Sequence, residues 1–253
     1  MKITQSLVED LVAEVAPKVE ELTEWSAYLE SLSIEALGWE KAWHEIFIPE
    51  LESRGIDTIP KTLAGKRRKY VFKETLFQGA VGFHMESTGN IYIINDNFPK
   101  INKDQLAPMV GHELVHRCQF KNNQKFSELC HYFSKEYKGE NYFDQDLSED
   151  YNDLVFRNFM RLQEGHATFV QIELQKDYPP SELYLPKSIE NALMDVQRLN
   201  PDNMGTYIAE LFDVYQSGER IIRNVFHQGG NDAIKELYKR DKVGFLRSPF
   251  DRF

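Results

Sequence analysis

The sequence predicts an α+β fold that is mainly α-helical, and three observations support this prediction. Apolar residues recur at the spacing of one helix face through residues 6–54 and again from about residue 104 onward. Between these regions, residues 80–95 have the pattern of two strands joined by a tight turn. The chain has 253 residues, of which 42% are hydrophobic and 28% charged, so it can bury a sizeable core.

The N-terminal part is expected to contain two or three amphipathic helices, ended by Gly55 and Pro60. We therefore divide the chain into an N-terminal helical segment, residues 1–60, and a second unit, residues 61–253. The first segment is expected to be a helical layer of the same domain, with a separate cap or regulatory segment as the alternative. The apolar positions behind this prediction are Leu7, Leu11, Val15 and Val19, followed by Leu32, Ala36, Trp39, Trp43 and Ile46.

The strand-like region begins with Tyr70-Val71-Phe72 and continues with residues 80–85 and 90–95. Ser87-Thr88-Gly89 separates the last two segments, which are therefore predicted to form a β-hairpin. The basic run Lys66-Arg67-Arg68-Lys69 precedes this region. We expect it to be a solvated loop leading into the first strand, with nuclear import or a local anionic contact as alternatives.

From about Asp104 the pattern is helical. The first of these helices is predicted to run to Asn122, with Asp104 as its N-cap and Pro108 in its first turn, where proline is tolerated. Pro179-Pro180 and Pro186 break the chain between later helices. Those helices are predicted at about 126–137, 149–177, 188–199, 205–226 and 232–240.

Charge and cysteine content argue against several classes of protein. A net charge of −10 disfavours nucleic-acid binding, which needs positive charge to neutralise phosphates. Cys118 and Cys130 are too few for a disulfide framework and are expected to be reduced thiols, Cys118 as a small buried apolar residue. No signal peptide and no transmembrane stretch is recognisable. We therefore expect a cytoplasmic protein with neither a membrane nor a nucleic-acid partner, whose oligomeric state the sequence does not indicate.

The most informative motif is His112-Glu113-Leu114-Val115-His116, because HExxH on a helix is half of a catalytic zinc site. Residues four apart lie on one helix face, about 6 Å apart along the axis, so both imidazoles can reach one metal ion. Glu113 lies beside that face and can take a proton from a metal-activated water. The alternative is a helix with two ordinary histidines.

A catalytic zinc usually has three protein ligands and one open position, so a third ligand is needed. Glu164 is the strongest candidate, because Gly165 and Ala167 would let its helix approach a neighbour closely. Its alternative role is an exposed helix carboxylate. His166 is the rival ligand, but it lies two residues away and points to a different helix face.

With these residues the chain resembles the zincin metallopeptidases, and among them the gluzincins, in which a Glu on a later helix is the third ligand. It looks most like uncharacterised bacterial gluzincin-like proteins that carry HExxH followed by three further elements. Those elements are Glu164-Gly165-His166-Ala167-Thr168, Tyr215-Gln216-Ser217-Gly218 and the turn Gly229-Gly230. The resemblance covers roughly residues 80–240 and implies a zincin-like fold for residues 61–253. In that fold a small sheet, through its edge strand, packs against the HExxH helix and a later ligand helix.

The chain departs from the family pattern at several points. Forty-seven residues separate His116 from Glu164, which implies a helical insertion. Thr168 replaces the Asp that thermolysin-like enzymes place after the ligand Glu, so a contact to a ligand His would come from a hydroxyl or another residue. Arg117 follows the second His, where zinc peptidases usually have an uncharged residue. We expect its charged end to reach solvent.

The resemblance implies one Zn²⁺ ion held by His112, His116 and Glu164, with a peptide or protein substrate. Glu113 would be the general base. Tyr215 is the first candidate for stabilising the oxyanion and His227 the second, while a buried aromatic and a helix-end His are their structural alternatives. The strand before the HExxH helix would be a sheet edge that pairs with substrate through Asn90, Ile91, Tyr92 and Ile93, unless it is fully paired within the sheet.

Two other functions remain open at this stage. One is a zinc-binding protein without proteolytic activity, in which a fourth ligand such as His166 or His131 would close the site. The other is a helical interaction domain that binds no metal. Neither the substrate nor the choice between endopeptidase and aminopeptidase follows from the sequence.

Overall fold

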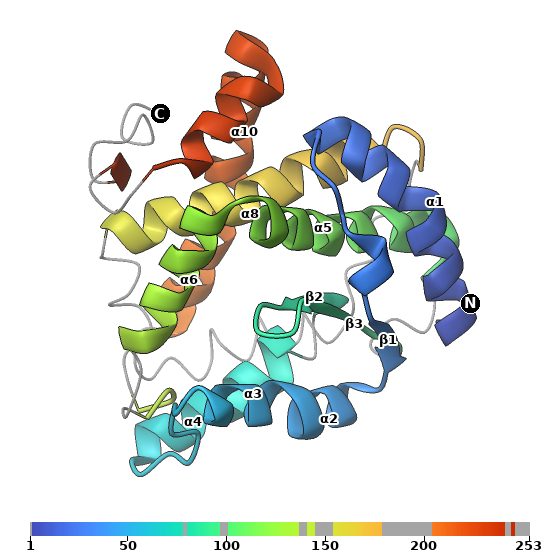
Figure 1. The fold of residues 1–253 in the computed structure, drawn as a ribbon. Coiled ribbons are helices and arrows are strands. Elements are labelled where there is room, and N and C mark those ends of the chain that lie inside the picture. Colours follow the sequence, from blue (N-terminus) through green and yellow to red (C-terminus); the bar gives the residue numbers. More distant parts are fainter. Residues whose placement is uncertain are drawn as a thin grey trace.

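A small β-sheet lies between two helical layers in the computed structural model of this chain (Figure 1). The structure describes residues 2–77, 80–96, 101–136, 141–144, 154–178, 204–240 and 244–245. The described part is mainly helical, as the sequence predicts, and its three strands form one mixed sheet.

The sheet has the order β1-β3-β2, with β1 formed by Ile34–Leu37, β2 by Gly82–Met85 and β3 by Asn90–Ile94. β2 pairs antiparallel with β3, so the predicted hairpin is confirmed. β1 pairs with β3 in parallel, with Ile34 opposite Ile91. The prediction that residues 90–95 form a sheet edge is therefore wrong, because β3 is hydrogen-bonded on both sides.

β1 lies in a region that the sequence predicts to be helical. The apolar positions Leu32 and Ala36 have helical spacing, but residues 34–37 are extended. Their backbone groups bond to β3, more than fifty residues further along the chain, and so does a flanking residue, because Ile91 N–H donates to Ser33 O. Such a long-range parallel partner leaves no local signal, which explains the error. It also places the N-terminal segment inside the sheet.

The first helical layer carries most of the hydrophobic core. Its central helix is α5, Lys103–Asn122, which contacts both α1 and α8, while α8 contacts α10. Ile91 and Ile93 of β3 point into the same core cluster as α1. The helix at the start of the chain therefore shares this core with α5, α8 and the sheet. The other helices of this layer are α1 (Gln5–Thr23), α6 (Gln124–Glu136), α8 (Leu154–Leu174) and α10 (Met204–Tyr238).

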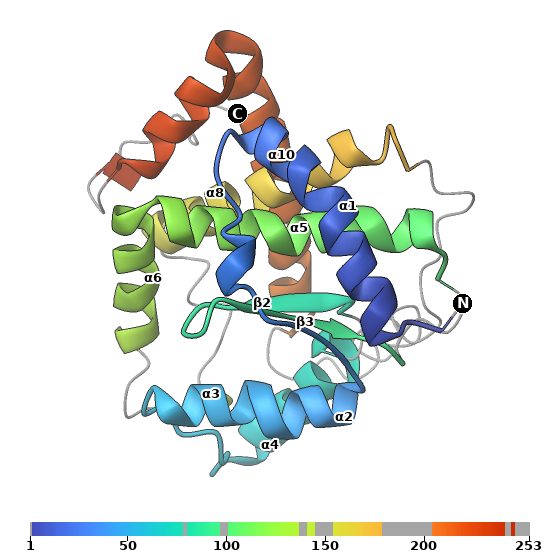
Figure 2. The same cartoon turned by 45° about the vertical axis from the view of Figure 1, so that its right-hand side comes forward.

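The second layer covers the opposite face of the sheet, as Figure 2 shows. Tyr92 and Ile94 of β3 point into this layer's aromatic cluster around Trp43. The layer consists of α2 (Trp39–Lys41), a π-helical segment (Ala42–Phe47), α3 (Ile48–Ser53), α4 (Leu63–Val71) and a second π-helical segment (Phe72–Phe77).

Two predictions for this layer are wrong. Residues 70–72 are helical rather than a strand, and the basic run 66–69 lies on α4 rather than in a loop. The helix is started by Thr62, whose hydroxyl accepts a bond from the backbone N–H of Gly65. Sequence reasoning weighted the aromatic and β-branched residues and missed this cap. Lys69 bonds to the carbonyl of Thr58, so only part of the run faces solvent.

α5 begins two residues earlier than predicted. Its N-cap is Asn102, whose side chain accepts from the N–H of Gln105 while the Gln105 side chain accepts from the N–H of Asn102. Asp104 is therefore a first-turn residue and not the cap. Pro108 lies in the second turn of the helix, where it is buried.

The predicted break at Gly229-Gly230 is confirmed, because non-helical backbone angles at both glycines kink α10. The helix predicted at 188–199 lies outside the described residues. None of the helices in the described part of the chain is both long and apolar enough to cross a membrane.

Candidate metal centre

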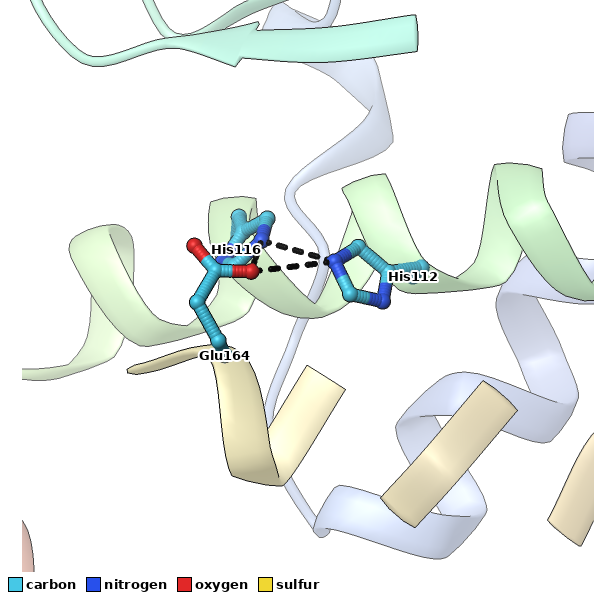
Figure 3. A group of neighbouring side chains, drawn as sticks. All are labelled: His112, His116 and Glu164. Carbon is cyan, nitrogen blue, oxygen red and sulfur yellow. Dashed lines mark hydrogen bonds and ion pairs between the residues drawn. The ribbon is translucent and has the colours of Figure 1, made fainter. Parts of the chain in front are cut away.

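Three buried ligand atoms meet where α5 passes α8 (Figure 3). Nε2 of His112 lies 3.1 Å from Nε2 of His116. Oε2 of Glu164 lies 3.4 Å from each of these nitrogens. All three residues are at least nine-tenths buried. The structure thus brings together the three ligands that the sequence predicts, and the group can hold a metal ion.

Close helix packing makes this meeting possible. A Cβ atom on Gly111 would lie 2.2 Å from Leu174 Cδ1 on α8, so a larger residue before His112 would have to displace the end of the Leu174 side chain. On the other side of α8, a Cβ on Gly165 would lie 2.3 Å from the backbone of Gly218 on α10. Gly165 does allow a close approach to a neighbouring helix, but that helix is α10, at the glycine of the Tyr-x-x-Gly segment, and not the HExxH helix.

Each histidine is held from behind by a glutamine. Nδ1 of His116 lies 3.0 Å from Oε1 of Gln119, and Nδ1 of His112 lies 3.0 Å from Oε1 of Gln171. Sequence reasoning missed both glutamines. A signal was present, because Gln119 is three residues after His116 and Gln171 is seven after Glu164, so each shares a helix face with a ligand.

These contacts fix which nitrogen of each ring faces the group. A carboxamide oxygen can only accept, so Nδ1 of each histidine donates and the lone pair of Nε2 points to the group, where it can bind a metal ion or a proton. The two lone pairs and the Glu164 carboxylate then converge in a buried space, which is favourable only with a cation among them. Oε2 of Glu164 has no hydrogen-bond partner among the described residues beyond its two 3.4 Å contacts to the rings.

The pKa shifts of His116 and Glu164 also indicate that a positive charge stabilises this group. Burial alone would lower the pKa of His116, but the Glu164 carboxylate raises it to about 9. Burial would raise the pKa of Glu164, yet the two imidazoles hold it well below its usual range. In the metal-free protein a proton therefore occupies the place that a metal ion could take.

Glu113 lies next to this group without belonging to it. Burial raises the pKa of its carboxyl group, while His112 and His116 act in the opposite direction. The backbone N–H of His84 on β2 also favours its charged form. Glu113 therefore lies between the metal-binding group and β2, the outer strand of the described sheet.

A cavity of about 160 Å³ opens over the group. Its walls include Glu113, Tyr215 and residues 82–84 of β2. The ring of Tyr215 stacks on that of His112, with 6.1 Å between their centroids. Tyr215 thus lies at the site, as predicted. Glu86, just after β2, also lines the cavity and pairs with Arg54 at 3.4 Å.

The other predicted residues lie elsewhere. His227 is exposed on α10, twelve residues or about 18 Å of helix beyond Tyr215, and does not line this cavity. Ile91, Tyr92 and Ile93 are buried in the central strand, which has no free edge for a peptide, and Asn90 begins the same strand.

His166 is not a ligand. Nδ1 of its buried ring lies 3.0 Å from the hydroxyl of Tyr238, and its ring meets Trp25 edge-on. Burial and then the charge of His116 lower its pKa to about 3, so the ring is neutral. The side chain of His131, the other possible fourth ligand, lies outside the described residues.

Arg117 contradicts the prediction that its charged end reaches solvent, because its side chain is fully buried. Its guanidinium donates to the carbonyls of Ala27 at 2.6 Å, Tyr28 at 2.8 Å and Gly89. It also donates to the Ser31 hydroxyl at 2.8 Å. Arg117 therefore ties α5 to the segment after α1 and to the turn of the β-hairpin.

Two further predictions concern residues near the site. Cys118 is buried as expected, and burial raises the pKa of its thiol to about 12. The hydroxyl of Thr168 is buried and has no hydrogen-bond partner among the described residues, so it does not orient either ligand histidine. The side chain behind His112 is Gln171, three positions further along α8.

Comparisons with known proteins give no match: no family model, no curated protein and no solved structure is similar to this chain. The chain's own geometry therefore carries the argument. It establishes a buried His-His-Glu group that can hold a metal ion, on a mainly helical fold with a small mixed sheet.

Proposed function

We propose that this protein is a zinc-dependent metallopeptidase. The observation that carries the proposal is the spacing of 3.1, 3.4 and 3.4 Å among the three ligand atoms. Zn²⁺ bonds of about 2.0 Å in a tetrahedral site place neighbouring ligands about 3.3 Å apart. Two neutral imidazoles and one carboxylate are also a ligand set typical of catalytic zinc.

The site supports catalysis better than a purely structural role. In the described part of the chain no fourth His, Cys, Asp or Glu joins the three ligands. The position opposite them faces the cavity. Three protein ligands with one open position are the arrangement of catalytic zinc, whereas structural zinc is usually closed by a fourth.

Zn²⁺ in this site would supply a Lewis acid that polarises water and a peptide carbonyl. Glu113 accepts the proton of the attacking water and passes it to the leaving amine. Its raised pKa brings it closer to the pKa needed for both transfers. Tyr215, which lines the cavity beside His112, donates a hydrogen bond to the oxyanion.

The substrate pairs with β2 rather than with β3. β2 is an outer strand of the described sheet, and three of its residues, Gly82, Phe83 and His84, line the cavity. An extended peptide added along this edge would lie directly over Glu113 and the metal-binding group. This replaces the predicted substrate contacts at Asn90, Ile91, Tyr92 and Ile93.

The test is Glu113→Gln, which removes the base but keeps the shape of the side chain. We expect the variant to bind one zinc ion as wild type does, while hydrolysis of a peptide library falls about 10²–10⁴-fold. Digestion followed by mass spectrometry measures this, with the exposed Glu236→Gln as the control. Equal hydrolysis by wild type and Glu113→Gln would disprove the proposed mechanism.

A metal-binding protein without proteolytic activity is the second candidate. Its support is the depth of the group, since His112, His116 and Glu164 are only 9%, 6% and 7% exposed. This candidate predicts stoichiometric zinc and no cleavage of any peptide by the wild-type protein.

A further inference from the structure

We infer that Gln119 and Gln171 are positioning residues that preorganise the metal ligands, and that their lack of charge keeps zinc affinity below what carboxylates would give. The inference rests on the proposed zinc site. It concerns what lies behind the ligands, where metal-binding histidines commonly donate to a carboxylate or a backbone carbonyl. Here both histidines donate to side-chain amides.

Gln119 has a fixed orientation. Its Nε2 donates to the carbonyl of Gln163 on α8 at 2.8 Å, so its Oε1 has to face Nδ1 of His116. The His116 ring therefore keeps its Nε2 toward Glu164, at the position where zinc would bind. Because Gln163 directly precedes Glu164, one side chain sets the position of ligands on two helices.

Gln171 makes the matching contact in the other direction. It lies on α8 and accepts from His112 on α5, whereas Gln119 lies on α5 and donates to α8. The two glutamines thus bridge the α5–α8 packing at both histidines. They hold the three ligand atoms 3.1–3.4 Å apart before any ion binds.

The neutral amides have an electrostatic consequence. Among the described residues Glu164 is the only carboxylate that joins the two histidines, while Glu113 and Glu86 line the cavity beside them. Zn²⁺ held by these three ligands would therefore keep a net positive charge. A carboxylate in place of either amide would make the histidine a stronger ligand and lower that charge. It would also repel Glu164 in the metal-free protein. Both effects favour tighter zinc binding.

The experiment measures zinc affinity by competition with a chromophoric chelator. Gln119→Leu and Gln171→Leu keep side-chain bulk but cannot accept from a histidine, so we expect affinity to fall about 10–100-fold. Gln171→Glu keeps the acceptor and adds the charge, so we expect affinity to rise about tenfold. Gln228 is exposed, and Gln228→Leu and Gln228→Glu provide the matched controls.

At position 171 the Leu variant should bind zinc more weakly and the Glu variant more tightly than wild type. A mere loss of packing would not raise the affinity in the Glu variant, so this pair of results identifies a positioning role. If zinc affinity changed by less than threefold in the Leu variants, the inference would be overturned. If those variants do not fold, Gln171→Glu decides, and unchanged or weaker affinity there overturns it. If wild type binds no zinc, the proposed function fails first, which is a different result from wild-type binding with insensitive glutamines.

Discussion

At the scale of single residues, Arg117 shows how a motif can be adapted to its surroundings. It follows the second His of HExxH, and its buried guanidinium bonds to the carbonyls of Ala27, Tyr28 and Gly89. The Tyr28 carbonyl also accepts from the backbone N–H of Ser31, whereas Arg117 supplies the donor to the carbonyls of Ala27 and Gly89. Through these hydrogen bonds the guanidinium connects the N-terminal segment and the β-hairpin to the helix that carries the two histidines.

Replacing Arg117 by Met should destabilise the protein. The carbonyls of Ala27 and Gly89 would lose the donor that Arg117 supplies, and a buried orphaned polar group costs about 1–3 kcal/mol. We expect the free energy of unfolding to fall by about 2–6 kcal/mol in urea titrations. Arg220→Met, at an exposed arginine with one backbone contact, should change it by less than about 0.5 kcal/mol. Similar losses in both variants would show that Arg117 has no special structural role.

The same scale shows what could be predicted about the site. His112, His116 and Glu164 were found from sequence because metal coordination demands certain residue types at helical spacing. Gln119 and Gln171 were not, because an amide that accepts one hydrogen bond has no distinctive sequence pattern. The buried end of Arg117 was missed for a related reason, since its partners are backbone carbonyls from distant segments.

At the scale of elements, the packing of α8 on α10 depends on glycine. Gly165 and Gly218 face each other, and a Cβ on Gly218 would lie 2.4 Å from the carbonyl oxygen of Arg161. This contact holds the helix that carries Tyr215 against the helix that carries Glu164. Backbone atoms cannot yield as a flexible side chain would, so the helices would have to separate.

Gly218→Ala tests this packing, because helix propensity and close packing predict opposite changes in the free energy of unfolding. Alanine favours an isolated helix over glycine by about 1 kcal/mol, so propensity alone predicts a gain in stability. We expect instead that the free energy of unfolding falls by about 1–3 kcal/mol because of overpacking. Chemical denaturation measures it. A variant as stable as wild type, or more stable, would contradict the close packing of these helices.

The elements that are marked by turn residues or by apolar periodicity in their own sequence were predicted correctly. The strand arrangement that depends on pairing with a segment far away in the sequence was not. The β2–β3 hairpin, α6 and the kink at Gly229-Gly230 follow from turn residues and periodicity. β1 was assigned to a helix because its pairing with β3 is set by the tertiary fold. The edge position of β2 was missed for the same reason, since strand order depends on that pairing.

At the scale of the whole molecule, the sheet separates two cores, and the metal-binding group lies on the side of the larger one. α1, α5 and α8 form this side, and β2 and Tyr215 of α10 line the cavity beside the group. A ligand on each of two core helices means that a bound ion would join elements far apart in sequence. Metal binding and folding should therefore be coupled.

The most direct test of this account is the zinc content of the purified protein, measured by elemental mass spectrometry after dialysis. We predict about one zinc per chain for wild type and none for His116→Ala or Glu164→Gln, each confirmed as folded by circular dichroism. Absence of zinc from wild type refolded with the metal, or equal zinc in all three proteins, would contradict the central claim.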